Sequence, residues 1–298
     1  MRTFLDCIPC FVRQALEAAR FATDDEAVHE QVLREALRVV SAQAPQPSPP
    51  ALGQALHRLI RNLTGNDDPY RAVKQRFNRI ALALYPRMRE QVEQSEDPFG
   101  TAVRLAIAGN TIDFGIYSQF DEAGIEDAID HALSASLRGD SQALQVAVDG
   151  AEEVLYLADN AGEIVFDCLL IEQMPLEKTT VGVRGMPVLN DATMEDAEAA
   201  GLTGLVRVIP NGSDAPGTLL EDCSDEFRRL FDRADLIVSK GQGNYETLSD
   251  ADKDIFFVLK AKCPVIARDL GCQVGDLVLR GNVAGPARSA AELTRTTA

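Results

Sequence analysis

The sequence has no tryptophan, only 6% aromatic residues and three histidines. The histidines (His29, His57 and His131) all fall in segments with helical periodicity, so neither a histidine metal cluster nor a Ser-His-Asp arrangement can be argued. No apolar run approaches the roughly 20 residues that cross a bilayer. The first residues meet Asp6 and two cysteines at once, which excludes a secretory signal pattern. We therefore expect a cytoplasmic protein without a membrane partner.

Positive charge, and lysine in particular, is scarce. There are 29 Lys and Arg against 46 Asp and Glu, a formal net charge of -17, and only six of the basic residues are lysines. Such an acidic chain repels phosphate backbones, so nucleic acid is excluded as a general partner. A small anionic substrate would need a local source of positive charge, such as a metal ion.

The six cysteines are expected to be reduced thiols, as is usual in the cytoplasm. Cys7-x-x-Cys10 invites a zinc or a redox interpretation. A structural zinc site needs four ligands, and no second CxxC or CxxH pair follows. Because Pro9 and Cys10 stand near an expected helix start, a reactive thiol remains an alternative.

The period of the apolar residues changes near the middle of the chain. The first 140 or so residues repeat apolar positions at helical spacing, and later short β-branched runs alternate with helical segments. Alternation of this kind predicts an α/β fold with a doubly wound, mostly parallel, Rossmann-like sheet. We expect a helical N-terminal cap region at residues 1–145, a metal- and phosphate-binding α/β core at 146–284 and a flexible tail at 285–298.

Polar residues follow the expected strands directly. Asp159 and Asn160 come after the run "EVLYLA", and Asp191 follows "TTVGVR" by a few residues. Ligands in such folds bind beyond the carboxyl ends of the strands. Carboxylate and amide oxygens suit Mg²⁺ or Mn²⁺ better than zinc. We therefore predict a metal site from Asp159, Asn160 and Asp191, although Asp159 or Asn160 could instead cap a helix.

Phosphate and catalytic groups are expected around this metal site. Gly162 opens a helix whose free N–H groups could hold phosphate, and Lys240 stands at a strand end before the glycines of "GQGNYETL". Glu163, in the first turn of that helix, is the candidate base or supporting group. The stretch "GNTIDFG" offers Asn110 and Asp113 from the helical half, although Asn110 could simply end a helix. Asp167 is expected to be structural.

Seven motifs occur in an order that resembles the damage-control phosphatase family, in its microbial branch with an N-terminal CxxC. The motifs are "CIPCFVRQAL", "GNTIDFG", "DNAGEIVFD", "RGMPVLNDAT", "CSDEF", "KGQGNYETL" and "KCPVIARDLG". The resemblance implies a phosphatase that uses Mg²⁺, Mn²⁺, Co²⁺ or Ni²⁺ on sugar or metabolite phosphates. It implies metal ligands at Asp159, Asn160 and Asp191, and substrate contacts at Asn110, Lys240 and Asn244.

The sequence leaves two possible mechanisms open. In-line attack comes either from a water molecule that the metal activates or from a carboxylate, for which Asp159 is the candidate, with Glu163 or Asp113 as base. The rival hypothesis is a non-catalytic metal- or thiol-based binding or sensor protein that uses the CxxC. A human branch of the family carries a methyltransferase label, but this chain has no glycine-rich nucleotide loop to support it. The physiological substrate and the oligomeric state are not determined by the sequence.

Overall fold

The computed structural model describes residues 1–42, 47–111 and 129–282, with only the backbone at 110 and 111. The predicted tail at 285–298 lies outside this part of the chain. The sheet has the order β1-β7-β6-β5-β2-β3-β4, and all neighbours are parallel except β6 and β7. Its strands are β1 (Leu137–Arg138), β2 (Val154–Leu157), β3 (Thr179–Val183), β4 (Arg207–Pro210), β5 (Leu236–Lys240), β6 (Ile255–Lys260) and β7 (Leu277–Asn282). The predicted α/β fold with a mostly parallel sheet is confirmed.

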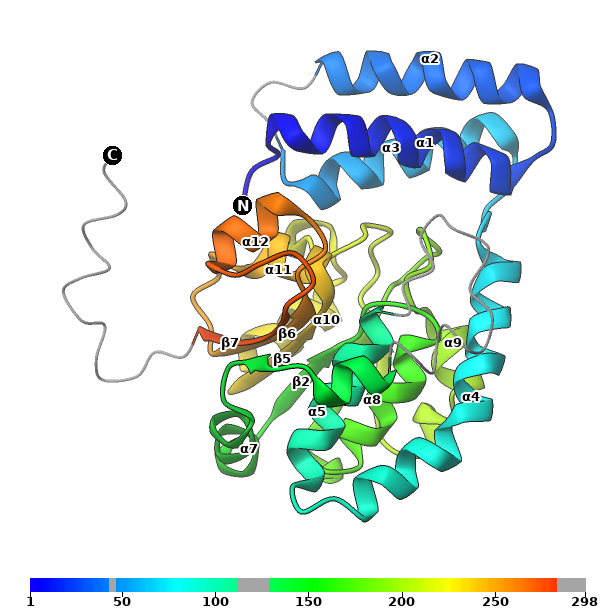
Figure 1. Ribbon diagram of the computed structural model, residues 1–298. Helices are drawn as coiled ribbons and strands as arrows, with labels where there is room; N and C mark the ends of the chain where they lie inside the picture. The colour runs from blue at the N-terminus through cyan, green and yellow to red at the C-terminus, as the bar shows by residue number, and fades with distance from the viewer. Residues whose placement is uncertain (43–46, 112–128, 283–298) are drawn as a thin grey trace.

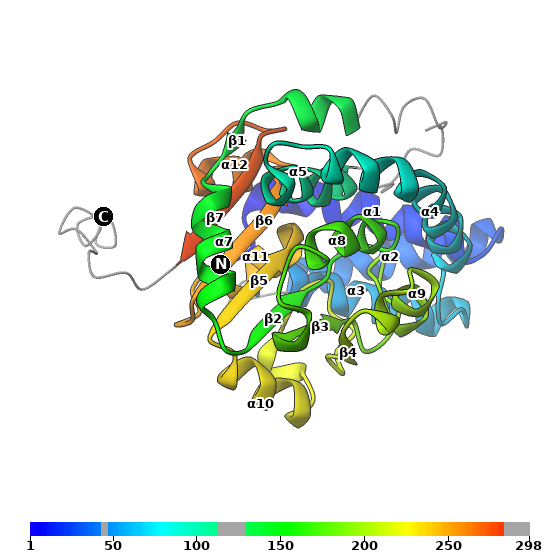
Figure 2. The same cartoon turned by 90° about the horizontal axis from the view of Figure 1, so that it is seen from below.

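Helices cover both faces of the sheet, which makes it doubly wound (Figure 2). The α-helices are α1 (Ile8–Ala22), α2 (Glu26–Ala42), α3 (Pro49–Thr64), α4 (Arg71–Glu93), α5 (Pro98–Thr111), α7 (Ser141–Gly150), α8 (Glu163–Ile171), α9 (Met194–Ala199), α10 (Asp225–Arg233), α11 (Gly241–Leu248) and α12 (Pro264–Leu270). One core joins α4, α5, α7, α8 and α9 to the sheet. A second core joins α10, α11 and α12 to the opposite face.

Strand β2 is apolar throughout because both of its faces are buried. In β2, Val154 and Tyr156 belong to one core while Leu155 and Leu157 belong to the other. Successive side chains of a strand point to opposite faces, so a strand between two helical layers needs an apolar residue at every position. This explains why the sequence shows continuous apolar runs here rather than alternation.

The helical first half of the chain divides between two places. Helices α1, α2 and α3 pack on one another around their own core and lie across the top of the molecule (Figure 1). We call these three helices the cap. Helices α4 and α5 instead pack beside the sheet and against α8. The cap thus contains fewer helices than the helical region predicted for residues 1–145. Pro86 lies inside α4.

The chain order of the strands reverses between β2 and β5. From β2 the sheet continues through β3 and β4 on one side, and from β5 through β6 on the other. The crossover connections leave in opposite directions at this point, which opens a crevice beyond the strand ends. The segments that follow β2 and β5 therefore flank the expected binding position.

Among the helices of the described residues, none combines the length and the hydrophobicity needed to span a membrane.

Candidate active site

The turns after β2 and β3 lie side by side. Asn160 and Asp191 form an antiparallel bridge, and the Ala192 N–H donates to the Asp159 carbonyl at 2.8 Å. A further bond of 2.8 Å runs from the Ala161 N–H to the Asn190 carbonyl. These backbone contacts bring together two segments about thirty residues apart. They place the three predicted metal ligands on one short stretch of paired backbone.

A cavity of about 750 Å³ opens between this paired backbone and the cap. Asp159, Asn160 and Asp191 all line it, and each is nearly buried, with 8%, 6% and 3% of its surface exposed. The cap contributes residues of α1 and α3 to the facing wall, including Phe11 and Gly53. A volume of several hundred Å³ with a few convergent polar groups is typical of a small-molecule site.

The carboxylates of this wall carry an excess of negative charge. Burial, and then the charges of Glu163 and Asp191, raise the pKa of Asp159 well above its ordinary value. Lys262 and Arg184 act in the opposite direction without reversing the shift. The ionised form of these carboxylates is unfavourable in the protein alone, and a bound cation would stabilise it.

A buried polar network lies behind the wall. The Asn160 amide donates to Asp159 and to Glu163, at 2.8 Å each. Lys240 donates to Glu163 at 2.6 Å, to Asp167, and to the carbonyl of Ala106 at 3.0 Å. Each donor and acceptor in this network fixes the next, so the orientation of the Asn160 amide beside the cavity is fixed as well.

This network corrects two predictions. Lys240 is fully buried, and its three N–H donors are already used by Glu163, Asp167 and Ala106, so the structure does not present it to a phosphate. Glu163 is 2% exposed and is not part of the cavity wall, so it supports Asn160 rather than facing a substrate. Asp167, expected to be structural, bonds Lys240 and accepts from Tyr156 at 2.8 Å.

Asn244 also differs from its predicted role as a substrate contact. It is fully buried, and its amide donates to the carbonyls of Ala158 and Lys240 at 3.2 and 2.8 Å. Its oxygen accepts from Thr218 and Arg184 at 2.8 and 3.2 Å. The side chain thus ties the end of β2 to the end of β5.

Gly162 also differs from its predicted role as a phosphate contact. Its N–H donates to the Asn78 side chain at 2.6 Å, so this amide is not available to a phosphate in the structure. The residue has a φ of 76°, and an added Cβ would stand 3.0 Å from the Cβ of Phe77. Glycine is required here by backbone conformation and by the approach of α4.

The segment after Lys240, which contains the glycines of "GQGNYETL", forms helix α11. Gly241 begins it with a φ of 79°, and an added Cβ would overlap the Asp159 carboxylate. The first turn of α11 therefore packs directly on the predicted metal ligand, which only a residue without a side chain allows.

Sequence reasoning missed several charged residues of the site. Arg184 is 2% exposed, donates to Asp191 at 2.6 Å and lies 3.8 Å from Asp159. Its position at the end of β3 could have revealed it, because a buried arginine after a strand needs carboxylate partners. The cavity wall also carries the cations Arg13, Lys260 and Lys262. The scarcity of lysine was the available signal for the last two.

Two predicted residues cannot be placed as side chains. Asn110 lies in the last turn of α5, whose backbone alone is described there. Asp113 lies outside the described residues. Their predicted roles in substrate binding and catalysis therefore remain predictions.

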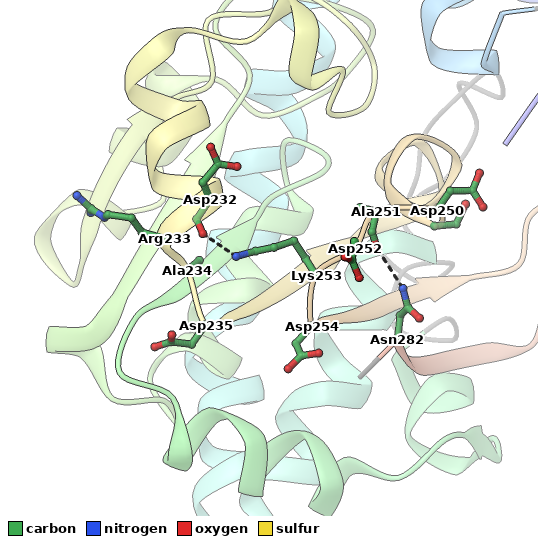
Figure 3. A pocket seen from close by; sticks show the side chains of 11 residues that line it. Asp232, Arg233, Ala234, Asp235, Asp250, Ala251, Asp252, Lys253, Asp254 and Asn282 are labelled. Carbon is green, nitrogen blue, oxygen red and sulfur yellow. Dashed lines mark hydrogen bonds between the residues drawn. The ribbon is translucent and has the colours of Figure 1, made fainter. Parts of the chain in front are cut away.

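A second hollow of about 730 Å³ lies at the opposite edge of the sheet, where β5 and β6 begin (Figure 3). Its rim is rich in aspartate, and Figure 3 shows the carboxylates of Asp232, Asp235 and Asp254 directed apart rather than toward one point. Lys253 is engaged there with the carbonyl of Asp232 at 2.8 Å. An acidic rim without convergent groups repels anions, so the first cavity is the candidate site.

The fold and this site define an α/β protein with a carboxylate-lined cavity at the switch point of a mostly parallel sheet. Residues 3–278 match the family model described as the damage-control phosphatase ARMT1-like domain. The chain therefore belongs to this family, and the resemblance seen in the sequence is confirmed.

Individual relatives agree over nearly their whole length. The chain is 38% identical to a damage-control phosphatase of Archaeoglobus fulgidus, over 92% of this chain and 97% of the relative. It is 35% identical to a damage-control phosphatase of Pyrococcus horikoshii, over 95% and 99%. The crystal structure of a DUF89 family protein from Pyrococcus horikoshii superimposes with a TM-score of 0.86 at 34% identity, over 95% of this chain and 100% of that one.

Proposed function

We propose that the protein is a divalent-metal-dependent phosphatase that hydrolyses phosphomonoesters of small metabolites, such as sugar phosphates. The observation that carries the proposal is the convergence of Asp159, Asn160 and Asp191 on one cavity wall. Family membership and the names of the relatives support the reaction class. Mg²⁺, Mn²⁺, Co²⁺ and Ni²⁺ are the candidate cations.

The donor set fits a hard divalent cation. Two carboxylates and one amide oxygen are the ligand types that Mg²⁺ and Mn²⁺ prefer. Among the described residues, no three His, Cys, Asp or Glu side chains gather closely enough to hold a metal by themselves. Asn160 is therefore an essential part of the proposed set with Asp159 and Asp191. When bound, the cation would polarise a phosphoryl oxygen and neutralise charge that develops in the transition state.

Side chains of the protein itself supply the remaining roles, which are positioning, proton transfer or attack, and attraction of phosphate. Arg184 and the Lys240–Glu163 pair hold the carboxylates and the amide in place from behind. Among the predicted catalytic groups of the described residues, Asp159 alone lies on the cavity wall, so we assign to it the role of base or nucleophile. Lys262, close enough to Asp159 to lower its pKa, is placed to attract the phosphate of an incoming substrate.

The rest of the wall suits a small metabolite. Phe11, Tyr70, Pro216 and Val265 supply apolar surface, while Arg13 and Lys260 add positive charge. Positive groups inside an otherwise acidic molecule select an anion that enters this cavity. We infer a small phosphorylated metabolite as the substrate and the cytoplasm as the site of action.

A hydrolysis assay tests the proposal. The purified protein should hydrolyse p-nitrophenyl phosphate with added Mn²⁺, Co²⁺ or Ni²⁺ and lose this activity in EDTA. Asp159→Asn should lower kcat/KM by at least about 100-fold, because it removes charge needed at the metal and in the transition state. A screen of phosphorylated metabolites under the same conditions would then identify the preferred substrate.

The matched control is Asp232→Asn, which removes an exposed carboxylate at the opposite edge of the sheet. It should retain the activity. Equal activity of Asp159→Asn and the wild type would refute the proposal. The rival thiol-based function predicts the reverse pattern, in which Cys7→Ser loses the function and Asp159→Asn keeps it. Methyl transfer would require measurable binding of S-adenosylmethionine.

A further inference from the structure

Three cysteines lie on the wall of the candidate active site and have no part in the proposed hydrolysis. Cys7, Cys10 and Cys263 line the cavity that also contains Asp159. They come from two segments more than 250 residues apart, the start of α1 and the residue before α12. Cys168 and Cys223, in contrast, are buried in the two cores. Cys272 is partly exposed as well, but it does not line this cavity.

Cys7 and Cys10 have the spacing of a disulfide pair. Cys7 caps α1 and Cys10 stands in its first turn, with Pro9 between them. Residues three apart on a helix are neighbours, with Cβ atoms about 5–6 Å apart. A disulfide needs Cβ atoms roughly 3.5–4.5 Å apart, so the first turn must tighten by about 1–2 Å to join the two sulfurs. All six cysteines are free thiols in the structure.

The two thiols differ in their surroundings. Cys10 is exposed, whereas Cys7 is partly buried. Burial, and then the nearby charges of Glu246, Cys263 and Cys10, raise the pKa of Cys7. Cys7 is therefore a protonated thiol at neutral pH, and Cys10 is the first to meet an oxidant from the solvent. Cys7 therefore lies near both Cys10 and Cys263 on the cavity wall.

We propose that Cys7 and Cys10 form a reversible dithiol–disulfide site, oxidised by small hydroperoxides, in the wall of the active-site cavity. The Cys10 sulfur attacks the peroxide O–O bond and takes one oxygen, which leaves Cys10 as a sulfenic acid and releases an alcohol or water. The Cys7 sulfur then attacks the Cys10 sulfur. The S–S bond forms, hydroxide leaves and departs as water with the proton of Cys7. The two thiols together lose two electrons to the peroxide.

Oxidation should reach the active site through α1. Phe11, Arg13 and Gln14 follow Cys10 directly and also line the cavity. Tightening the first turn of α1 would shift these side chains and slow the entry of a substrate. This consequence rests on the proposed function, while formation of the disulfide does not.

Thiol mapping tests the site. The full-length protein is treated with hydrogen peroxide, its free thiols are alkylated, and its peptides are mapped by mass spectrometry. Cys7 and Cys10 lie in one peptide, so we expect both alkylation sites to disappear as this peptide loses two hydrogens to an internal disulfide, and to return with dithiothreitol. Cys7→Ser should stop at a Cys10 sulfenic acid that dimedone labels. Cys272→Ser, which alters a cysteine that is not on the cavity wall, should behave as the wild type.

Two results would overturn the proposal. Either both cysteines stay open to alkylation in peroxide, or two peptides become cross-linked through Cys263 and one of the two cysteines. An activity assay adds a separate reading, in which oxidation should lower hydrolysis several-fold and dithiothreitol should restore it. If the reduced protein shows no metal-dependent hydrolysis, the proposed function fails, while the mapping still decides the thiol site.

Discussion

At the scale of single residues, the site depends on a lysine that touches no cavity. Lys240 is fully buried, and the charges of Asp167 and Glu163 stabilise its ammonium. Burial raises the pKa of Asp167 to about 7 even beside this cation. A buried charge is tolerated only when its partners are in place, so each member of the group depends on the others.

Removal of this cation should therefore destabilise the fold. Lys240→Met leaves two buried carboxylates without a partner, and we expect a loss of about 3–5 kcal/mol in the free energy of unfolding, measured with urea. The double variant Lys240→Met/Asp167→Asn should lose less than the sum of the single losses, because the second change removes a stranded charge. Lys253→Met, at the opposite edge of the sheet, is the control. A Lys240→Met protein as stable as the wild type would show that the network contributes nothing.

At the scale of elements, helix α3 attaches the cap to the sheet. Gln54 donates to Asp214 at 2.7 Å, and Arg58 and Arg61 form ion pairs with the same carboxylate. Asp214 belongs to the segment after β4, so these contacts hold one wall of the cavity in place. These hydrogen bonds keep the pKa of Asp214 below its ordinary value, against the effect of burial.

The same helix should make the cap sensitive to acid. His57 of α3 is 3% exposed, and burial together with the charge of Arg61 lowers its pKa from 6.5 to about 4. Between these two pH values His57 is protonated in the unfolded chain but neutral in the folded chain. The free energy of unfolding therefore falls as the pH drops from 6.5 to 4. The full loss is about 3 kcal/mol.

Urea unfolding at several pH values measures this effect. His57→Gln cannot titrate, so the stability difference between the wild type and this variant should shift by about 3 kcal/mol against the wild type from pH 7 to pH 4. His29→Gln, on α2, is the matched control and should follow the wild type. A constant difference across this range would exclude His57 as the acid-sensitive group.

At the scale of the whole molecule, charge is distributed unevenly. The formal net charge is -17, yet Arg13, Lys260 and Lys262 all line one cavity beside Asp159 and Asp191. Most of the surface repels anions, and this wall alternates cations with carboxylates. Such an arrangement would hold a metal ion and a phosphate next to each other.

Binding of a cation should stabilise the folded molecule as a whole. At a Mn²⁺ concentration 100 times its Kd, the free energy of unfolding should rise by about 2.7 kcal/mol, seen as a higher Tm. Asp191→Asn should abolish this increase, whereas Asp232→Asn should keep it. The same increase in both variants would place the Mn²⁺ elsewhere on the acidic surface, and this measurement does not depend on turnover.

Much of the fold could be predicted from local pattern. The strands β2 to β7 all coincide with short apolar or β-branched runs in the sequence, because a strand buried on both faces is mostly apolar. The two-residue strand β1 was not predicted, since it is too short to carry a pattern. Asp159 was singled out because a carboxylate directly after a buried strand is unusual, and Asp191 because it follows the next strand by several residues. Their role as metal ligands remains a prediction.

The sequence alone therefore determined the fold class and the segments that carry the candidate metal ligands, because both depend on neighbours along the chain. The tertiary structure decided which polar side chains face the cavity and which are buried behind it. Lys240 bonds residues 73, 77 and 134 positions away, and no local pattern contains such partners. The free energy of burying a charge depends on these distant contacts, so the role of Lys240 could be read only from the folded chain. The same holds for the position of Cys7 and Cys263 on one cavity wall.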